Sequence, residues 1–371
     1  MQRVLLIFGT RPEAVKMCPL ARELMRRGGV EATVCVTGQH RAMLDDVLRF
    51  FGVTPKYDLN LLRPGATLTE LTGAMLAHLP PVLRRERPDL VLVHGDTATA
   101  FAAALCAFEL ALPVGHVEAG LRSGDLAAPF PEEFDRRVVD MLSRVCFAPT
   151  AEARDNLLRE GKAPEAVFLT GNTVVDALRA TVREGFDHPL LRWAAGHPLV
   201  LFTAHRRESR GAPMGSMLSA LRRLLRIAPE ARAVFPVHGD PALRSLAERE
   251  LAGCENLRLT PPLPVETFHN LLSACRFCLT DSGGLQEEGA ALGKPVLVMR
   301  ACTERPEALR AGVLRLVGTR EDDIVSAALT LLRDEALYAS MARPSAVFGD
   351  GHAGERIADV IERGECDIFA P

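Results

Sequence analysis

The sequence predicts an α/β protein made of two Rossmann-like domains, each with a parallel sheet covered by helices on both faces. Short, apolar, β-branched runs alternate with amphipathic segments, and this β-α-β order starts again near residue 198. The length of 371 residues also exceeds that of a typical single domain. We therefore expect one domain over residues 1–172 and a second over 173–352. A C-terminal helical segment at about 353–371 is available to pack back on the first domain.

The individual elements follow from the apolar runs. In the first half, runs with the length and composition of buried parallel strands lie at 3–9, 31–38, 89–95, 113–119, 145–150 and 166–172. Amphipathic helices are expected between them, for example at 14–27 and 41–52. In the second half, strands with their following loops are expected at 198–208, 231–241, 256–262, 277–284 and 295–300. Helices are expected at 214–228, 241–252 and around residue 268.

Composition limits the class of function. The formal net charge of -3 gives no reason to expect general affinity for nucleic acid or an anionic membrane. The nine cysteines are odd in number and scattered, which is typical of reduced thiols in a cytoplasmic protein. Cys275 and Cys278 form one C-x-x-C pair without a partner pair, so a zinc or redox role has little support. The short apolar start and the lack of a long apolar stretch predict a soluble protein.

Polar clusters follow the predicted strands. Ligands of open α/β sheets bind at the carboxyl ends of the strands, so we expect a shared cleft between the two sheets. Asp96 follows one strand, Glu118 ends the next, and Glu132 closes the loop beyond. No G-x-S-x-G sequence accompanies these carboxylates, which argues against an α/β-hydrolase. The question is what so many carboxylates act on.

The second half carries the signals of a phosphate site. Ser282, Gly283 and Gly284 stand between a strand and a helix, where free N–H groups suit a diphosphate; a tight turn with a Ser cap is the alternative. Glu287 and Glu288 follow, either as helix-dipole charges or as acceptors for ribose hydroxyls. His205 opens a basic loop that either binds phosphate or is simply exposed.

The first half lacks the nicotinamide fingerprint. After the first strand the chain has Gly9 alone, then Arg11, and no G-x-G-x-x-G, so no NAD is expected there. Arg11 and Lys16 are candidates for binding an anion or carboxylate. The histidines are single and dispersed, so no metal is expected; a zinc site from His116 and Glu118, which alternate on a strand, stays a weak alternative.

Long blocks of the chain resemble one family. The blocks "FGTRPEAVKMCPL", "TGQHRAMLD", "VLVHGDT", "PVGHVEAGLRSGD", "FPEEFDRR", "GNTVVDAL", "HRRES", "LTDSGGLQEEGAALGKPVLVMR" and "TERPEALRAGVLRLVGT" are similar, in this order, to the bacterial non-hydrolysing UDP-N-acetylglucosamine 2-epimerases. The resemblance runs from residue 3 to about residue 352. It implies a GT-B type fold of the glycosyltransferase/phosphorylase kind, a homodimer, and interconversion of UDP-GlcNAc and UDP-ManNAc.

The resemblance also assigns roles. It implies that the enzyme eliminates UDP to form 2-acetamidoglucal and then adds UDP back, with Asp96, Glu118 and Glu132 as catalytic carboxylates and His205 stabilising the departing UDP. Substrate-binding positions carried over from the family are Arg11, Lys16, Phe268, Ser282, Gly283, Gly284, Glu288 and Arg305. Water exclusion by domain closure is expected, because stray water would trap the intermediate. The resemblance does not tell which carboxylate acts as base.

The chain departs from the family at some positions. Leu263 replaces the family's Gln near the uracil, so that side-chain contact is lost. Many members bind a second UDP-GlcNAc as an allosteric activator through a "QHR" loop, represented here by Gln39, His40 and Arg41. Ala42 lacks the polar side chain that some members place beside this loop, which leaves activation open.

Three other functions fit parts of the pattern. A glycosyltransferase of the same fold would need an acceptor pocket and no set of three carboxylates. A hydrolysing epimerase would release free N-acetylmannosamine, and the non-hydrolysing blocks argue against it. A nucleotide-sugar sensor would have no use for a base near the sugar.

Overall fold

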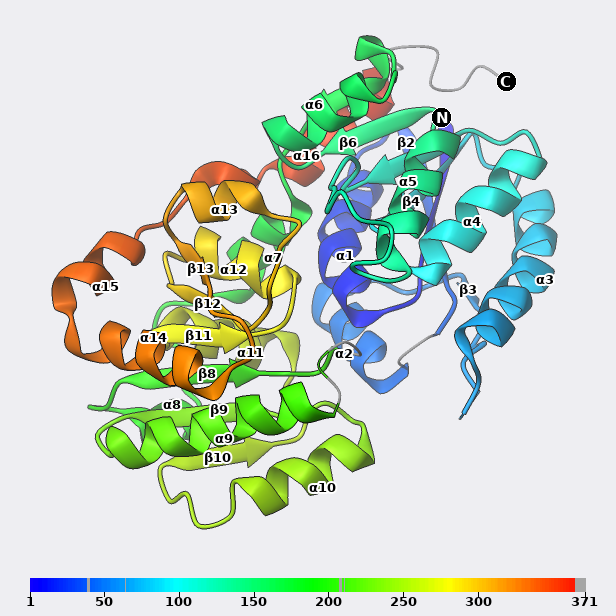
Figure 1. Cartoon of the computed structure of the whole chain (residues 1–371). Helices are drawn as coiled ribbons and strands as arrows, with labels where there is room; N and C mark the ends of the chain where they lie inside the picture. Colours follow the sequence, from blue (N-terminus) through cyan, green and yellow to red (C-terminus); the bar gives the residue numbers. More distant parts are fainter. Residues whose placement is uncertain (39–40, 64, 207–208, 210, 364–371) are drawn as a thin grey trace. The chain divides into compact units, whose positions relative to one another are not determined.

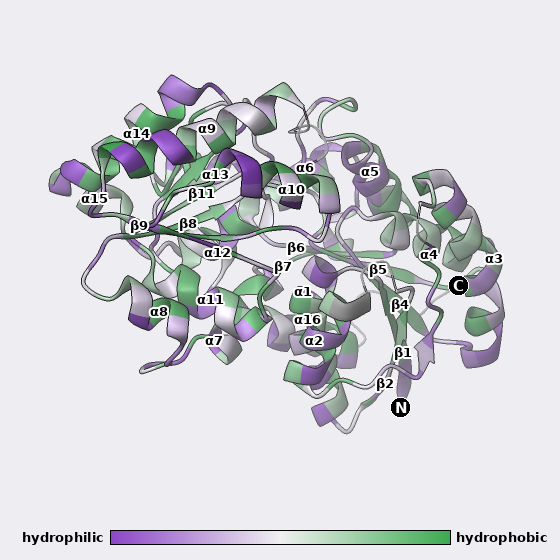
Figure 2. Ribbon diagram, turned by 90° about the horizontal axis from the view of Figure 1, so that it is seen from below, coloured by the Kyte–Doolittle hydropathy of each residue, from purple (hydrophilic) through white to green (hydrophobic). Residues whose placement is uncertain are grey.

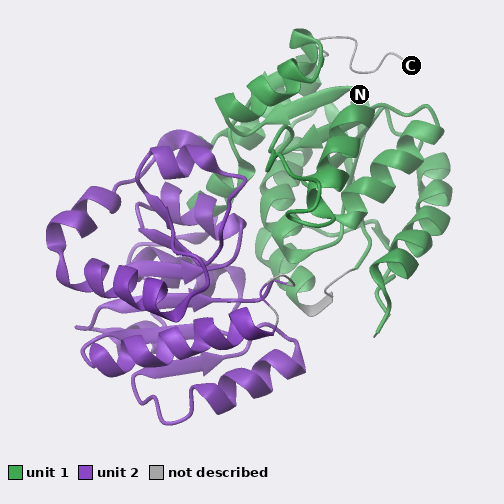
Figure 3. Cartoon of the chain, in the orientation of Figure 1, with its two compact units in different colours: residues 1–179, 349–371 green, residues 180–348 purple. Residues whose placement is uncertain are grey.

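The chain divides into two compact units (Figures 1 and 3), and the computed structural model describes residues 1–38, 41–63, 65–206, 209 and 211–363. The first unit comprises Met1–Arg179 and the segment that begins at Gly349; the second comprises Ala180–Phe348. The division after Arg179 falls within helix α7 (Thr173–Thr181). Each unit has its own parallel sheet, so the predicted class, two Rossmann-like α/β domains, is confirmed.

The sheet of the first unit has the strand order β3-β2-β1-β4-β5-β6-β7, and every pair is parallel. The strands are β1 (Gln2–Phe8), β2 (Val30–Val36), β3 (Tyr57–Asp58), β4 (Leu90–His94), β5 (Val114–Val117), β6 (Val145–Ala148) and β7 (Val167–Leu169). All of β4 and β5 is buried, as expected for strands covered on both faces. The short edge strand β3 was not predicted.

Helices cover both faces of this sheet. They are α1 (Arg11–Arg26), α2 (Arg41–Phe51), α3 (Leu68–Glu86), α4 (Ala98–Glu109), α5 (Glu132–Leu142) and α6 (Ala151–Arg159), with a 3-10 turn at Pro164–Ala166. Helices α3 and α4 share an apolar core with β1 and β4. Threonine side chains cap the starts of α1, α3, α4 and α6 by accepting a backbone N–H, at Thr10, Thr67, Thr97 and Thr150. These caps place each helix start directly after the preceding loop.

The C-terminal helix α16 (Ala353–Arg363) belongs to the first unit and packs against α1. Arg27 donates to Asp359 at 2.6 Å and to Glu362 at 3.0 Å. At the other end of α16, Asp176 of α7 accepts the backbone N–H groups of Ala353 and Gly354. Ion pairs and a helix-start carboxylate therefore hold α16 in place.

The sheet of the second unit has the order β10-β9-β8-β11-β12-β13. Its strands are β8 (Leu199–Thr203), β9 (Arg232–Pro236), β10 (Leu257–Thr260), β11 (Phe277–Thr280), β12 (Val296–Val298) and β13 (Leu314–Leu316), the last of which was not predicted. In both units the strand order reverses beside the first strand of the half, where open α/β sheets bind ligands.

The helices of the second unit are α8 (Pro189–Ala194), α9 (Ala212–Ile227), α10 (Pro241–Glu250), α11 (Val265–Ala274), α12 (Gly284–Ala291), α13 (Pro306–Arg310), α14 (Glu321–Arg333) and α15 (Glu335–Met341), followed by a 3-10 turn at Ala346–Phe348. A proline in the first or second position starts α8, α9, α10 and α13. Helices α9 and α14 pack together over one face of the sheet, and α8 and α11 line the other.

The helices are hydrophobic on one side and hydrophilic on the other, as the alternating colours of α14 show (Figure 2). Among the described residues, no helix combines the length and the apolar character needed to cross a bilayer.

Candidate active site

Glu118 is the most constrained of the predicted catalytic residues. It follows β5 directly and has a backbone φ of +69°, in the left-handed region that side chains with a Cβ seldom adopt. Lys16, which is buried on α1, forms an ion pair with its Oε2 atom. Asn172 Nδ2 donates to the same oxygen at 2.7 Å. The structure thus brings two predicted residues, Lys16 and Glu118, into direct contact.

Asp96 has a different cation. It follows β4, and Arg136 of α5 donates to its Oδ2 from both Nε, at 3.1 Å, and Nη2. The same guanidinium donates from Nη1 to Glu133 at 2.8 Å. Glu133 is fully buried and also accepts the backbone N–H of Ser123 at 2.9 Å. Glu133 therefore fixes the Arg136 guanidinium, which in turn holds Asp96 with two donors.

Glu132 is the first residue of α5, where a negative charge is favoured by the helix dipole. Asp135 lies one turn further on the same helix and is buried. Burial, together with the charges of Asp96 and Glu132, raises the pKa of Asp135 to about 7. Asp135 is therefore affected both by Asp96, in the loop after β4, and by Glu132, at the start of α5.

Two histidines of this region are buried. Burial lowers the pKa of His94 to about 4, against the opposing effect of Glu118, whose Oε2 lies 3.7 Å from His94 Nε2. His94 is thus neutral at neutral pH. The ring of His116 lies between Asp140, at 2.6 Å from Nδ1, and the carbonyl oxygen of Gly95, at 2.8 Å from Nε2. Both nitrogens of His116 are engaged, so the weak zinc alternative for His116 and Glu118 is not supported.

The remaining predicted residues of the first unit lie near the start of α1 and α2. Arg11 is the first residue of α1, half-buried, with Nη1 4.0 Å from Met43 Sδ. Of the three positions predicted for allosteric activation, Gln39 and His40 lie outside the described residues, and Arg41 is the first residue of α2.

In the second unit, Asp281 organises the loop that follows β8. It is fully buried at the end of β11 and accepts the backbone N–H groups of His205 and Arg206, at 3.0 Å and 2.9 Å, and the hydroxyl of Ser209, at 2.8 Å. His205 itself is partly exposed, and its Nδ1 lies 3.5 Å from Asp281 Oδ1. Sequence reasoning missed this role of Asp281, although its place between β11 and the Ser-Gly-Gly turn was a signal.

The Ser-Gly-Gly turn leads into α12 as predicted. The backbone N–H of Ser282 donates to Thr280 Oγ1 at 2.9 Å, and Gly283 precedes the helix. Arg305 lies against this turn: a Cβ added at Gly283 would stand 2.9 Å from Arg305 Nη1. A side chain at this position would therefore require the guanidinium to shift. Predicted residues from the turn and from the start of α13 are brought together here.

A buried acidic group supports Arg305. Its Nε donates to Glu287 Oε1 at 2.6 Å, and both side chains are buried. Glu304 accepts two hydrogen bonds from Arg300. Burial opposes ionisation of Glu304, but Arg305, Arg300 and Arg206 together hold its pKa well below its usual range. Of the two glutamates left open by the sequence, Glu287 thus binds Arg305.

Glu288 has separate neighbours. Its Oε2 lies 3.7 Å from Nε2 of the buried His269, whose Nδ1 is 2.7 Å from Thr181 Oγ1. Phe268 precedes His269 on α11 and is half-buried against the apolar cluster of α8 and α11, which also includes Leu263. A carboxylate and an aromatic ring thus lie on neighbouring elements of the second unit.

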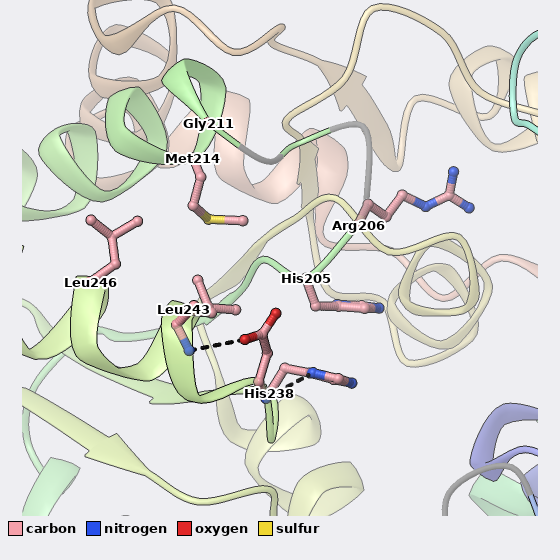
Figure 4. A pocket seen from close by; sticks show the side chains of 9 residues that line it. His205, Arg206, Gly211, Met214, His238, Leu243 and Leu246 are labelled. Carbon is pink, nitrogen blue, oxygen red and sulfur yellow. Dashed lines mark hydrogen bonds between the residues drawn. The ribbon is translucent and has the colours of Figure 1, made fainter. Parts of the chain in front are cut away.

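A pocket of about 260 Å³ opens beside His205 (Figure 4). The rings of His205 and His238 are stacked, with centroids 5.9 Å apart and planes inclined by 12°. Arg206 borders the pocket, and Met214, Leu243 and Leu246 supply its apolar side. A polar and an apolar wall meet here, as in many sites for organic ligands.

Within the described ranges, no group of three or more His, Cys, Asp or Glu side chains is arranged to hold a metal ion. Cys275 and Cys278 are buried free thiols. Burial raises the pKa of Cys275 to about 12 and that of Cys278 well above its usual value, so both remain protonated at neutral pH.

Known proteins share this architecture over almost the whole chain. The family model described as UDP-N-acetylglucosamine 2-epimerase matches residues 22–362. The UDP-N-acetylglucosamine 2-epimerase of Bacillus subtilis (strain 168) is 46% identical over 357 residues, which is 96% of this chain and 94% of the relative.

Solved structures of proteins with related sequences have the same fold. The UDP complex of S. aureus MnaA is 45% identical, with a TM-score of 0.95 over 98% of this chain and 96% of its own. The UDP-GlcNAc 2-epimerase from Neisseria meningitidis, bound to UDP-GlcNAc, is 39% identical, with a TM-score of 0.93 over 98% and 100% of the two chains. These similarities confirm the GT-B type of fold. The chain belongs to the UDP-N-acetylglucosamine 2-epimerase family.

Proposed function

We propose that this protein interconverts UDP-N-acetylglucosamine and UDP-N-acetylmannosamine by eliminating UDP and adding it back. One observation carries the proposal: in a chain of this family, the carboxyl edge of the first sheet presents Asp96 and Glu118, each held by a buried cation. The relatives from S. aureus and N. meningitidis, which bind UDP and UDP-GlcNAc, support the choice of ligand.

The chemistry explains the need for two kinds of group. The proton on C2 of the sugar is not acidic, because no carbonyl group adjoins C2 in the ring. Breaking the C1–O bond lets UDP leave with the bonding electrons and builds positive charge at C1. A carboxylate then takes the proton from C2, which yields 2-acetamidoglucal and UDP. In the return step a phosphate oxygen bonds to C1, and a carboxylic acid protonates C2 from the opposite face.

The carboxylates of the first unit would serve this proton transfer. We assign Asp96, Glu118 and Glu132 to the base and acid roles, without choosing a face for each. Arg136 holds Asp96 with two donors and Lys16 stabilises the charge of Glu118, and preorganised groups need little reorganisation during the reaction. Arg11 would bind an anionic or carboxylate group beside them.

The second unit would hold the nucleotide. Arg305 and the backbone of Ser282, Gly283 and Gly284 offer a cation and N–H groups to the diphosphate, and His205 would stabilise UDP as it leaves. Glu288 would accept bonds from the ribose, and Phe268 would lie near the uracil. The chain has no G-x-G-x-x-G after its first strand and its histidines are dispersed, so we expect the reaction to need neither NAD nor a metal. From the family we also expect a cytoplasmic homodimer.

The test is a proton NMR time course with purified protein and UDP-GlcNAc in D2O, with EDTA present and no added cofactor. We expect UDP-ManNAc to form and the C2 proton signal to be lost to deuterium in both sugars. Accumulation of free N-acetylmannosamine and UDP would instead identify a hydrolysing enzyme. Unchanged UDP-GlcNAc, also when more substrate is added as an activator, would overturn the proposal.

A further inference from the structure

A buried amide lies beside Glu118. Asn172 stands between β7 and α7 and is only 2% exposed. Its Nδ2 donates to Glu118 Oε2 at 2.7 Å, and its Oδ1 accepts the backbone N–H of Val174 at 3.0 Å. A backbone N–H can only donate and an ionised carboxylate can only accept. The two contacts therefore agree on one orientation of the amide.

Glu118 needs such support. Its φ of +69° is disfavoured for any residue with a Cβ, and such conformations persist only where the surroundings hold them. Lys16 supplies a charge to Oε2, but its ammonium group sits on a flexible stem and has little directional preference. The side chain of Asn172 is short and is anchored at its other end by the start of α7. The amide can therefore set the direction of the carboxylate more strictly than the lysine.

His94 does not duplicate this contact. Its Nε2 lies 3.7 Å from Glu118 Oε2, beyond hydrogen-bonding distance. The imidazole is buried and forms a wall beside the carboxylate. Of the two donors described for Oε2, Lys16 and Asn172, the amide is therefore the more directional.

We propose that Asn172 is a positioning residue for the C2 proton transfer: it aims the Glu118 carboxylate through a single hydrogen bond. This inference rests on the proposed epimerase function and adds to it a residue from a third element, the start of α7. A proton-transferring group must lie within about 3 Å of its target, and a displacement of about 1 Å can lower the rate by about 10²-fold.

The informative variant is Asn172→Asp. It has the same shape and keeps an oxygen for the Val174 N–H, but when ionised it offers Glu118 no donor. Two carboxyl groups this close share one proton, so the pair retains it to a higher pH than either group alone. The protonated pair restores a hydrogen bond. We expect kcat of the variant to fall about 10²-fold at pH 8 and to recover as the pH is lowered towards 6, with affinity for UDP unchanged.

Asn256→Asp is the matched control. Asn256 donates to the backbone carbonyls of Leu225 and Ala231 in the second unit, so the same substitution also removes donors from a structural amide. Its kcat should follow the wild-type pH profile. If Asn172→Asp also follows that profile, or keeps kcat within twofold of the wild type at pH 8, Asn172 does not position Glu118.

A second measurement does not depend on turnover. In the Asn172→Asp variant, the shared proton raises the pKa of the new carboxyl pair in the folded state. The pair's contribution to the free energy of unfolding is therefore present at low pH and is lost as the pH rises through that pKa. Urea unfolding from pH 5 to 8 should show this loss, and Glu118→Gln in the same background should abolish it. If the wild-type protein forms no UDP-ManNAc, the proposed function fails; if the loss is absent, the contact between Asn172 and Glu118 fails.

Discussion

The carboxyl edges of the two sheets use charge in opposite ways. In the first unit, buried cations support carboxylates: Arg136 holds Asp96, and Lys16 holds Glu118. In the second unit, buried carboxylates support cations and backbone: Glu287 holds Arg305, and Asp281 holds the loop that begins at His205. Similar strand-loop-helix units thus present anionic groups in one case and anion-binding groups in the other.

This difference indicates a division of labour. A proton on carbon must be taken by a base and returned by an acid, which suits carboxylates of fixed direction. A departing diphosphate needs cations and N–H groups. We therefore expect loss of a carboxylate in the first unit to reduce turnover and leave UDP binding intact. Loss of a supporting carboxylate in the second unit should weaken UDP binding.

The largest effect is expected for Asp96→Asn. An amide cannot exchange the proton, and loss of a general acid or base typically costs about 10²–10⁴-fold in rate. UDP affinity, measured by calorimetry, should stay close to that of the wild type. Turnover can be followed by the deuterium exchange assay described above.

Asp89→Asn is a matched control for this prediction. Asp89 also pairs with an arginine, accepting from Arg3 at 3.0 Å, but it precedes β4 and so lies at the opposite edge of the same sheet. The control should keep its turnover. If Asp96→Asn remains as active as Asp89→Asn, Asp96 has no part in the proton transfer.

An intermediate effect is expected for Glu287→Gln. The substitution removes the charge that fixes Arg305 against the turn at Gly283, so UDP affinity should fall by about tenfold, the equivalent of about 1.4 kcal/mol. The turnover number at saturating substrate should change less. Glu321→Gln provides the control: Glu321 on α14 accepts from Ser219 and Arg223 on α9, and its substitution should leave UDP affinity unchanged. A Glu287→Gln protein that binds UDP normally but turns over slowly would contradict the proposed division.

The sequence predicted the carboxylates and the turn at the two edges better than the residues that support them. Asp96, Glu118 and Ser282 could be placed because parallel strands end at the same edge of a sheet. Of their supporting residues, Lys16 was expected only as a residue that binds an anion, a carboxylate or the substrate, and Arg136 and Asn172 were not expected. Arg136 is 40 positions from Asp96, and Asn172 is 54 positions from Glu118, so no local pattern links these pairs.

The adjacent glutamates of α12 show the same limit. Successive helical residues point about 100° apart, and the two glutamates have different described neighbours: Glu287 accepts from Arg305, and Glu288 lies beside His269. The sequence pattern could not assign these neighbours, since both glutamates occupy the first turns of the helix. The edge strands β3 and β13, of two and three residues, were also missed.

Asp135 sharpens the comparison and has the smallest expected effect on the reaction. It is a buried carboxyl of the first unit whose pKa is raised to about 7, whereas an unfolded Asp has a pKa of about 3.9. Because the pKa of Asp135 is raised in the folded state, its contribution to the free energy of unfolding is fully present below about pH 4 and is lost as the pH rises through about 7. Asp135→Asn removes the titrating group. The variant should therefore gain stability relative to the wild type between pH 5 and 8, by roughly 2–4 kcal/mol, because one pKa unit corresponds to about 1.4 kcal/mol.

Urea unfolding at several pH values measures this difference, with Asp155→Asn as the control. Asp155 is exposed and paired with Arg154 beside it, so its substitution should leave the pH dependence of stability unchanged. Parallel stability curves for the wild type and Asp135→Asn would show that Asp135 is ionised throughout. The carboxyl edge of the first sheet would then hold another charged carboxylate, Asp135, close to Arg136. The negative charge of this edge could no longer be assigned to Asp96 and Glu118 alone.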